Sequence, residues 1–171
     1  MRDFPRDQEF LLPASNAFIA GSLFVALLLD WLPWSGVGMA LRPDFVALAL
    51  LYWCTHKPYR LGIGISWMVG VFADVADASL FGQHALAYTV LAFGGVVLHR
   101  RMHMLDLRQQ TLQIFPVLLA GYVTYALVNW QLHGYIAWTY FLGCVTSALL
   151  WIPLTLLMQA IRVPRADPDE L

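Results

Sequence analysis

Six apolar segments follow one another along the chain, and only short polar stretches separate them. A helix crosses the hydrocarbon core of a bilayer with about 20 residues at a rise of 1.5 Å per residue. The chain has 60% hydrophobic and 12% charged residues, so a soluble domain of 171 residues could not bury its apolar surface. We therefore predict an all-α, single-domain bundle of six transmembrane helices over residues 1–171, with spans at about 14–34, 38–55, 59–80, 83–98, 112–130 and 136–161.

The second and fourth segments are the shortest of the six. The second reaches spanning length only if it includes the step Arg42-Pro43-Asp44. A five-span alternative makes this segment a re-entrant element that enters and leaves the bilayer on one side.

The basic residues favour six spans and set the orientation. Under that reading nine of the ten Lys and Arg residues fall on one side, and only Arg42 falls on the other. Five spans would scatter these charges over both sides. The positive-inside rule then places both termini in the cytoplasm. Residues 162–171, with two prolines and an acidic end, are predicted to be a disordered cytoplasmic tail.

Asp74 and Asp77 lie inside the third apolar segment. A charged side chain at the bilayer centre costs about 2.5–3.5 kcal/mol on insertion scales, so it is expected to face protein, water or a partner. On a helix, Asp74 continues a stripe of small residues at every fourth position, Gly62, Ser66 and Gly70. Two interpretations stay open: the stripe and its carboxylates anchor a partner helix or ligand, or they pack within the monomer, with local partners satisfying the acids.

Arg42-Pro43-Asp44 is the second polar feature. Proline suits the first turn of a helix, and an aspartate complements the positive helix start, so the step is typical of a capped helix. Alternatively, Arg42 is kept on its unusual side because it pairs with a carboxylate. The candidates are Asp44 itself, Asp30, Asp74 and Asp77.

Two carboxylates in a membrane segment also raise the question of catalysis. Intramembrane aspartyl proteases carry one aspartate in a Gly-x-Gly-Asp turn, whereas Val-Phe-Ala precedes Asp74 here. His84 beside the two acids is weak evidence for a metal, and the two cysteines lie in apolar runs that suit packing. We therefore expect no catalytic residue, no metal and no cofactor. The net charge of −1 implies no nucleic-acid partner.

Three motifs taken in order resemble one bacterial family. They are Arg42-Pro-Asp-Phe-Val-Ala-Leu-Ala-Leu-Leu-Tyr-Trp53, Gly70-Val-Phe-Ala-Asp74 and Gly82-Gln-His-Ala-Leu-Ala-Tyr88. Together with the length and the absence of extramembrane domains, they resemble the MreD family of rod shape-determining proteins. Asp77 is not a position that this resemblance assigns.

The resemblance implies a non-enzymatic inner-membrane subunit of the lateral-wall elongation machinery. Such a protein binds MreC and, with MreB and the RodA–penicillin-binding-protein-2 synthase, helps to direct peptidoglycan insertion. It also implies a fold similar to the S-components of energy-coupling-factor transporters, with a pocket that opens outward. The alternative function is accordingly a transport subunit that binds a small molecule or lipid, and an intramembrane hydrolase is a third, weaker reading.

Overall fold

The computed structural model describes residues 16–77, 79, 82–102, 104–134 and 138–161, and within these residues it is all-helical. The tail predicted for residues 162–171 lies outside this part of the chain. Six long helices and a single helical turn are formed. They are α1 (Asn16–Asp30), the one-turn α2 (Val37–Ala40), α3 (Phe45–His56), α4 (Ile63–Ala76), α5 (Gln83–Met102), α6 (Leu107–His133) and α7 (Tyr140–Ala160).

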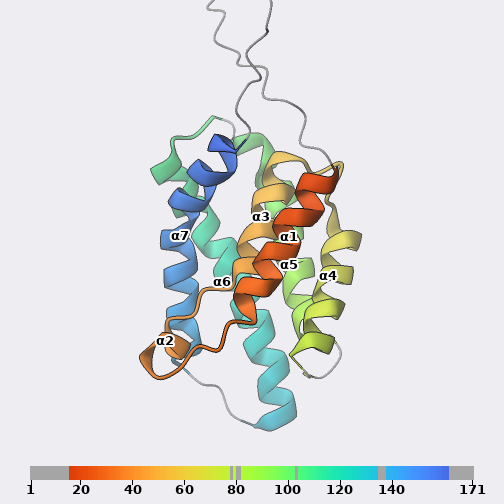
Figure 1. The fold of residues 1–171 in the computed structure, drawn as a ribbon, viewed down its shortest axis with the longest axis vertical. Helices are drawn as coiled ribbons and strands as arrows, with labels where there is room; N and C mark the ends of the chain where they lie inside the picture. Colours follow the sequence, from red (N-terminus) through yellow and green to blue (C-terminus); the bar gives the residue numbers. More distant parts are fainter. Residues whose placement is uncertain (1–15, 78, 80–81, 103, 135–137, 162–171) are drawn as a thin grey trace, which may run out of the picture.

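The six long helices alternate in direction, so the start of α1 and the end of α7 lie at the same end of the bundle (Figure 1). We call this the basic end, because five basic residues of the described chain lie there, in loops or in the terminal turns of helices: Lys57, Arg60, Arg100, Arg101 and Arg108. Arg42 follows α2 at the opposite end, which we call the distal end. Among the described residues, these five basic side chains and Arg42 thus lie at opposite ends of the bundle.

Helix α3 is the centre of the bundle. Ten of its twelve residues are buried, because α1, α5 and α7 pack around it. A helix surrounded on all sides needs apolar residues on every face, which explains why this segment lacks an amphipathic pattern. Its Trp53 also donates an indole hydrogen bond to the Ser22 hydroxyl of α1, at 2.9 Å.

The segment expected as one span over 38–55 is instead two helices separated by the non-helical residues 41–44. Proline fixes its own φ and disfavours helix at the preceding residue, so Pro43 ends the helical path. The segment lies along α7: Thr146 donates to the Leu41 carbonyl at 2.9 Å. A Cβ on Gly143 would lie 2.6 Å from the Arg42 carbonyl oxygen, so a glycine is what allows this approach.

Lengths of the helices differ from the predicted spans. Among the described residues, only α6 and α7 are both long and apolar enough to cross a membrane by length and composition. Helices α1, α3 and α4 are apolar but have 15, 12 and 14 residues, so the third predicted span (59–80) is helical only over its middle part. Helix α6, with 27 residues, is longer than the predicted 112–130.

Candidate functional site

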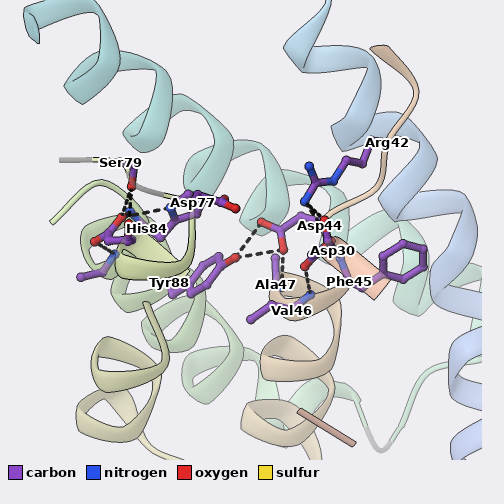
Figure 2. Close-up of polar contacts among 12 residues, drawn as sticks. Asp30, Arg42, Asp44, Phe45, Val46, Ala47, Asp77, Ser79, His84 and Tyr88 are labelled. Carbon is purple, nitrogen blue, oxygen red and sulfur yellow. Dashed lines mark hydrogen bonds and ion pairs between the residues drawn. The ribbon is translucent and has the colours of Figure 1, made fainter. Parts of the chain in front are cut away.

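Helix α3 begins inside the protein, and two aspartates satisfy its first backbone groups (Figure 2). The first four N–H groups of a helix lack intrahelical partners and are costly to bury unpaired. Asp30, the last residue of α1, accepts from the Phe45 and Val46 N–H groups at 3.2 and 3.0 Å. Asp44 is the N-cap and accepts from the Ala47 N–H at 2.7 Å.

The remaining N–H group at this helix start belongs to Asp44 itself, and it donates to the Ser147 hydroxyl of α7 at 3.1 Å. Tyr122 of α6 lies 3.1 Å from the same hydroxyl oxygen. Ser147 is fully buried. Side chains from α1, α6 and α7 therefore converge on the start of α3, which fixes where that helix begins.

Arg42 pairs with Asp30 rather than with the other candidate acids. Its guanidinium lies 3.9 Å from the Asp30 carboxylate and also donates to the Asp30 backbone carbonyl. The Arg42 side chain is 32% exposed, against 13% for Asp30. Of the four pairings considered from the sequence, the structure forms the one with Asp30.

Asp74 lies at the end of α4 and satisfies the start of α5. It is fully buried. Its carboxylate accepts from the N–H groups of Gly82 and His84, both at 2.7 Å, and from Ala85 at 3.4 Å. The Ser79 hydroxyl donates a further hydrogen bond at 3.1 Å. This arrangement repeats that of Asp30: an acid that ends one helix accepts from the first N–H groups of the next long helix.

His84 connects the two aspartates that the sequence singled out. Its Nδ1 lies 3.0 Å from Asp74, and its Nε2 lies 3.7 Å from Asp77. An ionised carboxylate only accepts hydrogen bonds, so Nδ1 carries the proton toward Asp74. The Asp77 side chain is 41% exposed and follows the last turn of α4. The two acids thus have different roles: Asp74 is an internal cap, and Asp77 faces outward.

The small-residue stripe of α4, Gly62, Ser66 and Gly70, contacts other parts of the same protein. A Cβ on Gly70 would lie 2.4 Å from the Ala85 Cα, so α4 and α5 approach backbone to backbone at this point. Ser66 is fully buried, donates to the Gly62 carbonyl at 3.2 Å and lies 3.7 Å from the Cys54 thiol. Gly62 is the N-cap of α4.

A cavity of about 270 Å³ opens at the distal end and joins the two aspartate clusters. Tyr88 lies between them, and its hydroxyl donates to Asp44, with oxygen distances of 3.1 and 3.2 Å (Figure 2). Charged and aromatic side chains dominate the polar part of the lining: Asp30, Arg42, Asp44, Asp77, His84, Tyr88, Tyr122, Tyr125 and Tyr140. Within the described residues, no group of three His, Cys, Asp or Glu side chains is arranged to hold a metal ion.

Several of these residues were not singled out from the sequence. Asp30 and His84 were considered only as partners for other residues, and the tyrosines of α5, α6 and α7 were not assigned to a site. No local signal marks the capping roles of Asp30 and Asp74, because the preference for carboxylates at helix N-termini acts within the first turn and both residues lie further from the helix that they cap. The convergence of four tyrosines on one cavity depends on helix packing, which no local pattern records.

Comparisons with known proteins agree with the motif resemblance. The family model described as rod shape-determining protein MreD matches residues 14–161. A relative named "Rod shape-determining protein MreD", from Haemophilus influenzae, is 30% identical over 139 residues, which cover 81% of this chain and 86% of the relative. No solved structure matches the chain. The matched region includes every described helix, and the chain belongs to the MreD family of rod shape-determining proteins.

Proposed function

We propose that this protein is a six-span subunit of the rod-shape machinery in the bacterial inner membrane, with both termini in the cytoplasm. Membership in a family of shape-determining membrane proteins is the observation that carries the proposal. The separation of Arg42 from the five basic residues at the opposite end of the bundle supports the orientation under the positive-inside rule. The carboxylates of the site serve as helix caps, which supports a non-enzymatic role.

In this proposal the principal partner is MreC, and through it the protein works with MreB and the RodA–penicillin-binding-protein-2 synthase to direct lateral peptidoglycan synthesis. A partner helix needs a free helix face. Gly70 and Asp74 contact α5, so they support this interface only indirectly, by holding α4 in place. Arg42 and Asp44 lie at the cavity instead.

The free face of α4 is the better surface for a partner helix. Helix α4 lies at the edge of the bundle, and α5 is its only extensive neighbour among the described helices. Its outward face carries exposed apolar side chains, Ile65, Met68, Phe72 and Val75. We propose that the single transmembrane helix of MreC packs along this face, in the half of α4 nearer the distal end.

Co-purification from membranes tests this interface. Phe72→Ala should reduce the MreC recovered with the protein, whereas Leu149→Ala on α7 should not. The two side chains are matched in exposure, at 64% and 68%, so both variants should insert and fold equally well. Equal MreC recovery with both variants would remove the α4 face from consideration. Depletion of the protein should convert rod-shaped cells to spheres, and retention of rod shape would contradict the wider proposal.

The second candidate is a transport subunit that binds a small molecule or lipid. The cavity at the distal end is the observation that favours it. Such a subunit requires an ATPase partner. If the protein purified from native membranes carries an ATPase with it and no MreC, that result favours this candidate over the first.

A further inference from the structure

The charges around the distal cavity do not balance within the protein. Asp30 has Arg42 at 3.9 Å, whereas Asp74 and Asp77 share His84, at 3.0 and 3.7 Å. Asp44 has no ion pair with any residue that the structure describes: its carboxylate accepts only from the uncharged Ala47 N–H and Tyr88 hydroxyl. A carboxylate within a membrane protein is costly to ionise unless a cation or several donors accompany it. The carboxylates of the site outnumber its basic side chains, and Asp44 is a cavity-lining carboxylate without an ion pair of its own.

An aromatic wall lines the same cavity. The ring of Tyr140 lies 4.8 Å from that of Tyr122 and 5.0 Å from that of Tyr125, measured between centroids. Tyr125 in turn lies 4.8 Å from the His84 ring. Aromatic faces attract organic cations through their quadrupole, and they do so more strongly where water is excluded. A carboxylate beside such a wall is the arrangement that binds organic ammonium groups.

The size of the cavity fits an organic group better than an inorganic ion. Its volume of about 270 Å³ is much larger than the roughly 10–15 Å³ that a cavity needs to hold one water molecule, and it is just below the range of pockets for drug-sized ligands. The described residues supply no three-ligand metal cluster. A short alkyl chain that ends in an ammonium group matches both the volume and the charge.

We propose that this cavity binds an alkylammonium group, which donates hydrogen bonds to Asp44 and lies against the rings of Tyr140 and its neighbours. Two sources have this chemistry: the ethanolamine headgroup of a membrane lipid and a soluble amine. Trp31 also lines the cavity, and tryptophan is enriched where membranes meet water, so the proposal includes an opening at headgroup depth. This inference does not depend on the proposed role in the rod-shape machinery.

Binding is tested with the full chain in lipid nanodiscs. One set contains phosphatidylglycerol alone, and ethanolamine or n-butylamine is titrated into it and followed by tyrosine and tryptophan fluorescence. A second set adds phosphatidylethanolamine, and native mass spectrometry measures which lipid stays bound. Saturable binding of the soluble amines alone identifies a soluble ligand. Selective retention of phosphatidylethanolamine, displaced by the soluble amines, identifies the lipid headgroup.

The decisive variant is Asp44→Asn, because asparagine is an equally good N-cap residue and keeps the start of α3 while removing the charge. We expect it to weaken ammonium binding by about tenfold or more. Asp106→Asn is the matched control, since Asp106 is the N-cap of α6 and makes no side-chain capping bond. Tyr140→Leu should also weaken binding, whereas Tyr140→Phe, which keeps the ring, should bind more tightly than the leucine variant.

Three results would overturn the proposal. One is the absence of saturable binding by either amine together with equal retention of both lipids, which would mean that Asp44 is simply protonated beside an empty cavity. Another is binding by Asp44→Asn as tight as by the unmodified chain. The third is equal weakening in Asp44→Asn and Asp106→Asn, which would assign the effect to net charge.

Discussion

The Asp74 carboxylate accepts hydrogen bonds from both the backbone N–H and the ring Nδ1 of His84, at 2.7 and 3.0 Å. A single side chain therefore fixes the turn between α4 and α5 in two ways: it satisfies the start of α5 and it orients the ring that lines the cavity. Because the carboxylate is fully buried, no water can take its place as the acceptor for the two His84 groups if it is removed. The turn that leads into the backbone-to-backbone approach of α4 and α5 at Gly70 depends on this contact.

Replacing Asp74 with alanine should therefore destabilise the protein strongly. The variant leaves several buried donors unsatisfied, and each unpaired group costs about 1–3 kcal/mol, so we expect a loss of at least about 3 kcal/mol in the free energy of unfolding. Asp77→Ala should cost about 0–1 kcal/mol of unfolding free energy, because the Asp77 side chain is exposed and its ion pair with His84 is long, at 3.7 Å. Reversible unfolding in mixed detergent micelles measures both, and equal losses would contradict the division of roles between the two acids.

Gly70→Ala should push α4 away from α5. The added methyl group would lie 2.4 Å from the Ala85 Cα, and since that atom belongs to the backbone, a whole helix must move. Overpacking of this kind costs about 1–3 kcal/mol. The control is Gly64→Ala on the same helix, where nothing lies within 4 Å and the change should be neutral or stabilising by up to about 1 kcal/mol. Thermal unfolding that is the same for both variants would show that the helix contact is not close.

Asp30→Ala should destabilise the start of α3. It removes the acceptor of the Phe45 and Val46 N–H groups and leaves Arg42 without its carboxylate. We expect a loss of about 2–4 kcal/mol in unfolding free energy, within the range for buried capping and charge networks. Asp106→Ala removes an N-cap aspartate without a capping bond, so its loss should stay below about 1 kcal/mol. A loss for Asp106→Ala as large as that for Asp30→Ala would contradict this assignment.

The orientation of the bundle can be read from cysteine labelling. The natural thiols, Cys54 and Cys144, are buried and are replaced first with alanine. Ser35→Cys at the distal end should react with a membrane-impermeant maleimide in intact spheroplasts. Met104→Cys at the basic end is 88% exposed in its native form and should react only after the membrane is opened. The reverse pattern would place the basic end outside.

Much of the architecture was predictable from the order of apolar segments, because a continuous apolar run indicates a helix of a membrane protein and short loops make neighbouring helices antiparallel. The sequence offered two interpretations of Arg42-Pro43-Asp44, a capped helix start and the middle of one span, and the structure has Asp44 as the N-cap of α3. The predicted span over 38–55 was wrong because it gave the demand for a full-length span more weight than the local signal of Pro43. That demand does not hold for α3, which is surrounded by protein rather than lipid. A helix in the protein interior can begin partway across if side chains satisfy its first N–H groups.

The candidate site was predictable only in part, because the contacts between helices are not recorded in the sequence of any one segment. Asp74 and Arg42 were recognisable because charge inside an apolar segment is expensive, whichever partner it finds. Their partners depend on which helices touch. Gly143 and Ser147 are one example: they formed a visible small-residue pair in the sequence, yet only the folded chain shows that they accommodate residues 42 and 44 of another segment.

The attachment of residues 41–44 to α7 has a consequence for the order of synthesis. The ribosome releases α7 after all the other described helices, so α3 is made long before Ser147 and Thr146 can bind the segment that precedes it. With twelve residues, α3 is about 18 Å long and too short to cross a bilayer by itself. In the proposed membrane topology, the segment before α3 therefore gains its contacts with Ser147 and Thr146 only after the last described helix has been made.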